Sequence, residues 1–246
     1  MPKREIRITT EDGAAPAGLF LPEGGIGAAR AGVILYMDAF GPRAALDTMA
    51  ERMAAAGRAV LVPDLFYRAG TYGPFDAATA FGDEAKRAEL MALIGGTSQA
   101  MTAKDSGAFL DALAEAGATG PVGTVGYCMG GARALTAAAE YPGRVRAAAS
   151  FHGGNLASEA EDSPHRRAGE IKARVYVGMA GEDRSFPPAQ SALLAQALRE
   201  AGVDYALENY PGCAHGWCVS DHSVFNEAGA ERHWRRLGVF FDETLG

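Results

Sequence analysis

Five stretches of the chain are almost uninterrupted runs of apolar and small residues, and these runs restrict the fold more than any other feature. They cover residues 31–37, 58–62, 122–127, 145–151 and 175–179. A strand with one face in water alternates polar and apolar residues, whereas a strand covered on both faces is apolar throughout. The five runs therefore predict the buried strands of a parallel β-sheet that helices cover on both faces.

Helical patterns separate these runs. Within residues 44–56, Leu46, Met49 and Met53 recur near helical spacing, and Gly57 follows as a helix-ending residue. Similar helix-forming segments cover residues 101–116, 132–139 and 187–201. A half-buried edge strand is expected at residues 3–9, and a second strand is expected at residues 18–21. Because strand and helix alternate, we predict an α/β protein with a mostly parallel, doubly wound sheet, right-handed crossovers and a single domain over residues 1–246.

Two segments interrupt this alternation. Residues 66–98 are rich in glycine, and residues 155–169 are polar. Connections of this length often serve as lids or mobile segments. We expect both to be loops, and the first is a candidate lid.

Composition and charge exclude several classes of protein. The 246 residues carry a formal net charge of -7, and the dense basic runs are only two residues long, which argues against a nucleic-acid partner. With 48% hydrophobic residues the chain is globular rather than disordered. No apolar run has the length of a signal peptide or a membrane span, and the three cysteines form an odd, sparse set. We therefore expect a cytoplasmic protein without membrane association or a disulfide framework, either a monomer or a small homo-oligomer.

The most specific motif is the segment GYCMGG at residues 126–131, which lies between a predicted buried strand and a predicted helix. It matches the G-x-S-x-G nucleophile elbow with Cys128 in place of the serine. Glycines allow strand and helix to approach closely there, and the helix N-terminus favours a thiolate and a developing oxyanion. The backbone N–H of Met129 is one expected oxyanion donor. The alternative is an inert, buried cysteine in a glycine-rich turn.

A nucleophile elbow requires an acid and then a histidine later in the chain. Asp183 follows the apolar run at 175–179, and His215 follows an alternating strand at 204–210. Both therefore lie just beyond the carboxyl end of a predicted strand, where open α/β sheets bind their ligands. Glu182 competes with Asp183 for the acid role, and Asp183 could instead be an ordinary turn residue. Four other histidines are present, of which His152 follows a predicted strand and could line the same rim.

On these motifs the chain resembles the dienelactone hydrolase family of α/β-hydrolases, from about Val33 to the end. The matching pieces are the cysteine elbow, the turn GED at 181–183, the segment AHGW at 214–217 and the segment PDLF at 63–66. The resemblance implies an α/β-hydrolase fold and a triad of Cys128, His215 and Asp183. It also implies an acid near the thiol at Asp38, where the best-known members carry Glu, and a second oxyanion donor at the backbone N–H of Ala39.

The resemblance says less about the substrate. Dienelactone-cleaving members hold the substrate carboxylate with arginines, one of them four residues after the histidine, and here that position is Val219. Arg68 could still bind an anion, with Tyr72 close to it in the sequence. We expect the substrate-binding residues to be Asp38, Arg68, Tyr72, His152 and Trp217.

The predicted reaction is acyl transfer from a small carboxylic ester, lactone or thioester to Cys128, followed by hydrolysis. Neither a cofactor nor a metal is expected. A metal site formed by Cys213, His215 and Cys218 is conceivable but lacks a fourth ligand. Two other functions stay open: a binding or sensor protein without catalysis, and a redox-active thiol enzyme that pairs Cys128 with Cys213 or Cys218.

Overall fold

One eight-stranded sheet forms the centre of the molecule in the computed structural model, which describes residues 3–246. The strand order is β1-β2-β4-β3-β5-β6-β7-β8, and only the pairs β1–β2 and β2–β4 are antiparallel. The strands are β1 (Arg4–Thr10), β2 (Gly13–Phe20), β3 (Ala31–Tyr36), β4 (Arg58–Pro63), β5 (Val122–Tyr127), β6 (Val145–Phe151), β7 (Arg174–Glu182) and β8 (Tyr205–Ala214). The predicted fold class is confirmed; Met1 and Pro2 of the predicted domain lie outside the described residues.

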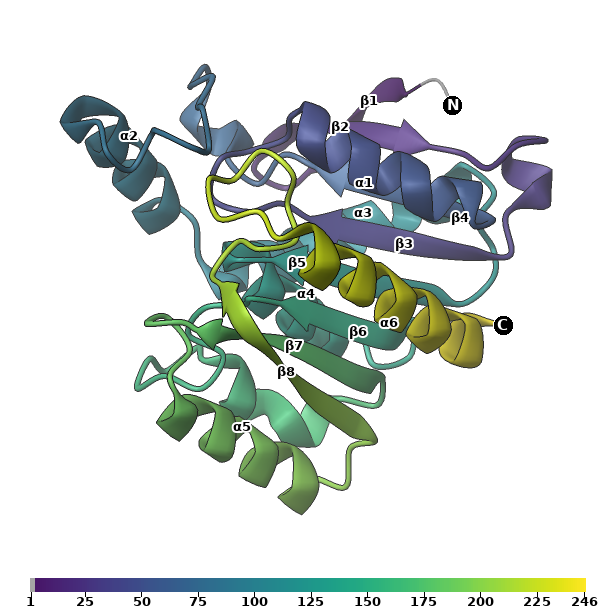
Figure 1. The fold of residues 1–246 in the computed structure, drawn as a ribbon. Helices are drawn as coiled ribbons and strands as arrows, with labels where there is room; N and C mark the ends of the chain where they lie inside the picture. The colour runs from purple at the N-terminus through teal and green to yellow at the C-terminus, as the bar shows by residue number, and fades with distance from the viewer. Residues whose placement is uncertain (1–2) are drawn as a thin grey trace.

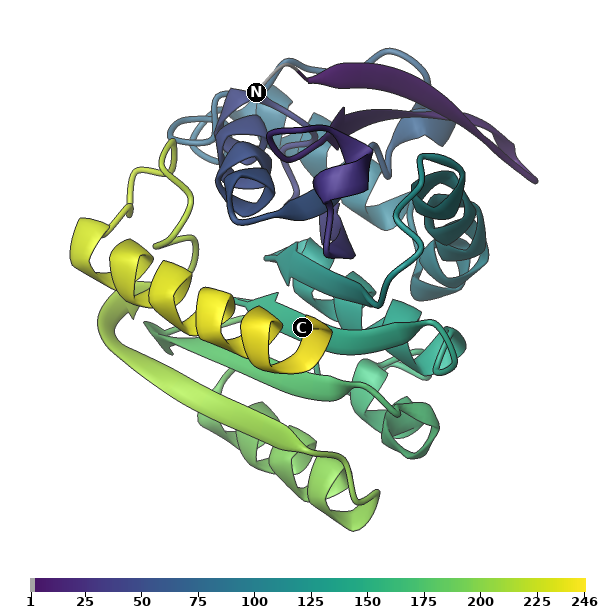
Figure 2. The same ribbon diagram turned by 90° about the vertical axis from the view of Figure 1, so that its right-hand side faces the viewer.

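Helices cover both faces of the sheet. The helices are α1 (Ala44–Ala55), α2 (Glu84–Gly95), α3 (Gln99–Glu115), α4 (Met129–Glu140), α5 (Pro188–Glu200) and α6 (Glu227–Leu245), with short 3-10 helices η1 (Ile26–Ala28), η2 (Tyr67–Ala69) and η3 (Pro164–Glu170). Helices α1 and α6 lie on one face, and α3, α4 and α5 lie on the other (Figures 1 and 2). The central strands β3, β4 and β5 are buried along their whole length, as their apolar sequences predict.

Two helices differ from the sequence-based expectation. The segment 66–98, expected to be a loop, contains α2, whose N-cap residue Asp83 accepts a hydrogen bond from the backbone N–H of Lys86. This helix buries only Leu90 and Leu93, and it projects beyond the carboxyl ends of the strands (upper left of Figure 1). The C-terminal helix α6 was not predicted, although Ala230, Leu237 and Phe241 provide a helical pattern of buried residues.

The candidate site residues gather at the carboxyl edge of the sheet. Met37 and Asp38 follow β3, Cys128 follows β5, His152 follows β6, Asp183 follows β7 and His215 follows β8. Since all five strands are parallel to one another, their carboxyl ends meet at one rim. The fold thus brings Asp38 into contact with His222 of the loop after β8, which lies 184 positions later in the chain.

Candidate active site

Cys128 stands on a strained turn between β5 and α4. Its backbone has φ 55° and ψ -119°, a conformation that L-residues rarely adopt, and its side chain is partly exposed. The turn is possible because its neighbours are glycines: a Cβ on Gly126 would lie 1.8 Å from the carbonyl oxygen of Gly130. The sulfur therefore projects from the first turn of a helix whose N-terminal amides favour negative charge.

His215 connects Cys128 to a carboxylate. Its Nδ1 lies 2.8 Å from Oδ2 of Asp183, and its ring is close enough to Cys128 for an electrostatic interaction with the thiol. Ser185 completes the arrangement, because its hydroxyl donates to Oδ1 of Asp183 at 2.6 Å and lies 3.1 Å from Nδ1 of His215. The backbone N–H of Ser185 donates to the same Oδ1 at 2.8 Å. The imidazole is thus held by a carboxylate that is itself fixed.

Charge in this group is concentrated on the imidazole and the carboxylate. Burial lowers the pKa of His215, but interactions with Asp183 and Cys128 outweigh it and raise the pKa to about 10. Burial raises the pKa of Asp183, but the hydrogen bonds from His215 and Ser185 keep it below its ordinary value. At neutral pH the structure therefore favours a protonated His215 beside an ionised Asp183.

Two backbone N–H groups close to the elbow have no hydrogen-bond partner within the described residues: those of Ala39 and Met129. Asp38 shapes the turn that carries the first of them. Its Oδ1 accepts from the backbone N–H of Phe40 at 3.0 Å, and its carbonyl accepts from the N–H of Gly41, which has φ 80°. Free amides at a helix N-terminus and in a tight turn are the donors that an oxyanion hole needs.

The side chain of Asp38 does not reach the thiol as the family resemblance implies. It is fully buried, and both of its oxygens are occupied by Arg43 at 2.7 and 2.9 Å, with Nε2 of His222 at 3.2 Å. Burial raises the pKa of Asp38, but His222 and Arg43 together keep it below its ordinary value. Asp38 is therefore held in its charged form by Arg43 and His222, and it anchors the turn rather than serving as a free base for Cys128.

His152 lies under the elbow instead of lining an open pocket. It is 1% exposed, and its Nδ1 accepts a hydrogen bond from the backbone N–H of Cys128 at 3.1 Å. Its ring packs edge-on against the rings of His215 and Trp217, at centroid distances of 4.9 and 5.3 Å. Burial holds the pKa of His152 well below its ordinary value, so that it is neutral, with its proton on Nε2.

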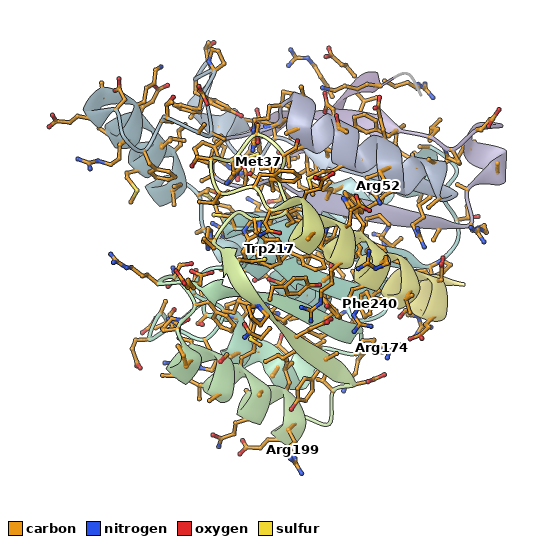
Figure 3. All side chains as sticks on the ribbon, viewed as in Figure 1. Met37, Arg52, Arg174, Arg199, Trp217 and Phe240 are labelled. Atoms are coloured by element: carbon orange, nitrogen blue, oxygen red, sulfur yellow. The ribbon has the colours of Figure 1, made fainter. Side chains whose placement is uncertain are left out.

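Trp217 also lies beneath the site. It is completely buried, and Figure 3 shows it inside the molecule, whereas Arg199 of α5 projects from the surface. The ring lies between His152 and Tyr210, so that it supports the site from below. In this position Trp217 packs against His152 and Tyr210 and has no exposed surface.

Known proteins share both the sequence pattern and the fold of this chain. The family model of the dienelactone hydrolase family matches residues 17–245. The chain belongs to the dienelactone hydrolase family. It is 28% identical over 222 residues to a protein of Synechocystis sp. that is provisionally named as a carboxymethylenebutenolidase, covering 87% of this chain and 86% of the relative. A similarly named protein of Methylorubrum extorquens is 26% identical, with 96% and 79% covered.

Solved structures of dienelactone hydrolases share the fold. A dienelactone hydrolase-like promiscuous phosphotriesterase from metagenomic libraries has a TM-score of 0.81 and 25% identity, covering 100% of this chain and 99% of that one. The dienelactone hydrolase of Anabaena variabilis has a TM-score of 0.69 and 20% identity, with 100% and 99% covered. The protein is therefore a dienelactone hydrolase-like hydrolase with an α/β-hydrolase fold.

Arg68, a candidate anion-binding residue of this hydrolase, does not join Cys128, His215 and Asp183. Its guanidinium pairs with Asp12 between β1 and β2 and with Asp105 of α3, at 2.7 and 2.8 Å. Because two carboxylates already neutralise this cation, we leave Arg68 out of the proposed site. Val219, which takes the place of an arginine in dienelactone-cleaving members, is completely buried.

Tyr72 lies on the other side of the turn formed by Asp38 and its neighbours. Its hydroxyl donates to Asp64 at 2.7 Å and packs against Gly41. It lines a cavity of about 790 Å³, together with Phe40, Arg43 and Asp64, and Cys128 is not among the residues that line this cavity. Tyr72 thus contacts the turn that carries the Ala39 amide rather than the elbow.

Four residues of the site were missed by sequence reasoning: Arg43, Ser185, Asp221 and His222. Ser185 lies two residues after Asp183, in the position of a turn-capping serine, and could have been found from that spacing. The other three lie in loops without a motif, and only the folded structure brings them together.

Cys213 and Cys218 are buried, and burial raises the pKa of both thiols. No group of three or more His, Cys, Asp or Glu residues among residues 3–246 could hold a metal ion, so the cluster of Cys213, His215 and Cys218 does not form there. Over the same residues, no helix combines the length and apolar character that crossing a bilayer requires.

Proposed function

We propose that this protein hydrolyses a small carboxylic ester, lactone or thioester through a triad of Cys128, His215 and Asp183. One observation carries the proposal: His215 interacts electrostatically with the Cys128 thiol, and its Nδ1 lies 2.8 Å from Oδ2 of Asp183. A nucleophile, a base and an orienting carboxylate in this order are what acyl transfer by an elbow residue requires.

In the first half of the reaction, the Cys128 thiolate attacks the substrate carbonyl while His215 carries the thiol proton. The carbonyl oxygen becomes an oxyanion, which accepts hydrogen bonds from the amides of Met129 and Ala39. As the tetrahedral intermediate collapses, its bond to the leaving alkoxide or thiolate breaks, and His215 gives its proton to that group. The product is a thioester on Cys128.

In the second half, a water molecule attacks the thioester. His215 now accepts the proton of the water, and the same two amides stabilise the second oxyanion. Collapse releases the carboxylic acid, and the cysteine regains its proton through His215. Asp183 stays ionised throughout and holds the imidazole in the orientation that both proton transfers need. A reducing cytoplasm, as the sparse cysteines favour, would keep the thiol available for this cycle.

The test is a panel of esters, lactones and thioesters with wild type and Cys128→Ala. The panel also includes a phosphotriester, because a structural relative carries that promiscuous activity. We expect turnover in wild type and a loss of at least about 10³-fold in the variant, since the triad works as a unit. Cys213→Ala is the matched control, because it removes a buried thiol from the end of β8.

The other two functions predict different results. A binding or sensor protein would leave every substrate of the panel intact while Cys128 still reacts with iodoacetamide. A redox enzyme would form a reversible disulfide from Cys128 to Cys213 or Cys218 under mild peroxide, visible by intact mass. Turnover that survives Cys128→Ala would end the proposal.

A further inference from the structure

Two loops of the site are joined by a pair of reciprocal contacts. The oxyanion loop, residues 38–43, carries the Ala39 amide, and the histidine loop, residues 215–226, carries His215. Arg43 of the oxyanion loop binds Asp221 of the histidine loop, and Asp38 of the oxyanion loop binds His222 of the histidine loop. Each loop thus contributes one carboxylate and one nitrogen-bearing side chain to these contacts.

Arg43 is the centre of this connection. Its guanidinium binds Asp38 through Nη1 and Nη2 at 2.7 and 2.9 Å, and it binds Asp221 through Nε and Nη2 at 2.6 and 2.9 Å. Two bidentate contacts from one guanidinium use nearly all of its donors and fix its plane. The side chain of Arg43 is 13% exposed and that of Asp38 is fully buried, so water and salt screen their interaction only weakly.

His222 forms the second contact between the loops. Its Nε2 lies 3.2 Å from Asp38, and its ring packs edge-on against Phe40 at a centroid distance of 5.2 Å. On the opposite side it lies against Gly216, where an added Cβ would come within 2.3 Å of Nδ1 of His222. His222 therefore fills the space between the oxyanion loop and the residue next to His215.

Backbone hydrogen bonds within the histidine loop connect Asp221 and His222 to His215. The backbone N–H of Val219 donates to Gly216, that of His222 donates to Val219, and that of Asn226 closes the loop on Trp217. These hydrogen bonds keep the loop compact. We therefore expect a shift of Asp221 or His222 to displace His215 as well.

We infer that Arg43 and His222 are positioning residues that set the Ala39 amide of the oxyanion hole relative to His215. Neither touches the reacting atoms; both act through Asp38, whose carboxylate shapes the turn that presents this amide. The inference rests on the proposed function.

The length of Asp38 fits this role. An aspartate can accept a hydrogen bond from the N–H two residues further along, as it does from Phe40, and this is the contact that shapes a tight turn. A glutamate at this position would place its carboxylate one methylene further out. The shorter acid therefore indicates an anchor for the oxyanion loop instead of a base for the thiol.

The experiment compares Arg43→Gln with Arg52→Gln in the full chain. Arg52 is the matched control because it also forms a bidentate pair, with Glu231 at 2.6 and 2.8 Å, but that pair lies on α1 and α6, away from the site. Three quantities are measured for each variant: kcat and KM for an ester substrate, the rate at which iodoacetamide alkylates Cys128, and the urea midpoint of unfolding.

For Arg43→Gln we expect kcat to fall about 10- to 100-fold with KM within about threefold, since a single oxyanion donor is worth about 10²–10³ in kcat. Alkylation should stay within about twofold of wild type, because it needs the thiolate but no oxyanion hole. Arg52→Gln should leave kcat, KM and the alkylation rate unchanged. Arg43 lines the 790 Å³ cavity, so guanidinium ions in solution can reach its position. Added guanidinium should therefore restore part of the kcat of an Arg43→Ala variant, and it should not increase the kcat of wild type.

Arg43→Lys separates charge from geometry. The lysine ammonium keeps the positive charge but cannot bind two carboxylates in bidentate fashion. The kcat of Arg43→Lys should therefore be closer to that of Arg43→Gln than to that of wild type. An Arg43→Gln variant with wild-type kcat would overturn the inference. A parallel fall of kcat, alkylation rate and urea midpoint would also overturn it, because Arg43 would then have only a structural role.

Failure of this inference can be told apart from failure of the proposed function. If Cys128→Ala keeps its turnover, the triad is wrong. A selective loss of kcat in Arg43→Gln would still support the connection between the loops in that case, because an oxyanion hole serves any nucleophile.

Discussion

Asp183 accepts three hydrogen bonds, and each of them helps to fix the His215 ring. Two come from the backbone N–H and the hydroxyl of Ser185, and the third comes from Nδ1 of His215. A carboxylate held by this many donors is stabilised in its charged form, which in turn stabilises the imidazolium. Ser185, Asp183 and His215 are thus linked by charge and hydrogen bonds. The pH dependence of the reaction should therefore change when the charge of Asp183 is removed.

Asp183→Asn tests this chain. The variant keeps the shape of the side chain but loses the charge that raises the pKa of His215 to about 10. Because His215 must carry the proton for the leaving group, kcat/KM falls as pH rises through its pKa, and this alkaline limb should move to lower pH in the variant. We also expect kcat to fall on the order of 10²–10⁴-fold, as in other triads. A pH–rate profile checks both; an alkaline limb at the wild-type position would contradict the assignment of Asp183.

At the scale of elements, the elbow is the part of the fold with the least freedom. Strand β5 and helix α4 meet at Cys128 with no space for side chains: besides the close approach at Gly126, a Cβ on Gly130 would lie 2.3 Å from the carbonyl oxygen of Tyr36 in β3. The elbow therefore depends on glycine for packing between three elements.

Gly126→Ala should prevent the native packing of β5 against α4. The added methyl group would overlap backbone atoms, which cannot turn aside as a flexible side chain could, so we expect a loss of stability beyond the ~1–3 kcal/mol usual for overpacking. Gly143→Ala is the control, because nothing lies within 4 Å of its added Cβ. Urea unfolding measures the difference; equal midpoints for the two variants would contradict this view of the elbow.

Sequence patterns predicted the parts of the molecule that local chemistry determines. The apolar runs predicted the buried strands, and the GYCMGG segment predicted the strand–turn–helix at Cys128, because glycine spacing and β-propensity act within a few residues. Helix α2 was not predicted, because the glycines on both sides of it are typical of a loop. Helix α6 was also not predicted, although Leu237 and Phe241 show helical spacing. The contacts of Arg43 with Asp221, and of Arg68 with Asp105, join residues far apart in the chain and have no local signal.

For the whole molecule, buried neutral histidines make stability depend on pH. His233 is completely buried, and burial lowers its pKa to about 3, while its Nε2 lies 2.9 Å from the hydroxyl of Tyr127. The unfolded chain binds a proton at this histidine below about pH 6.5, whereas the native chain does not until about pH 3. The free energy of unfolding should therefore fall as pH falls between these values.

His233→Gln removes this proton uptake and keeps a polar group for Tyr127. Between pH 6 and pH 4 wild type should lose about 2–3 kcal/mol more stability than the variant, since each pH unit is worth ~1.4 kcal/mol per proton taken up on unfolding. His152, whose pKa is also lowered, contributes in the same direction in both proteins. Urea unfolding at the two pH values measures the difference, and identical losses would show that His233 is not the source.

The most direct test of Cys128 as the nucleophile is to measure the mass of the protein after it has been quenched with acid during ester turnover. We predict an acyl adduct of the substrate's carboxylic acid, mapped by peptide digestion to Cys128 alone. No adduct should form in Cys128→Ala. An adduct on another residue, or rapid turnover with Cys128 never acylated, would contradict the proposed chemistry.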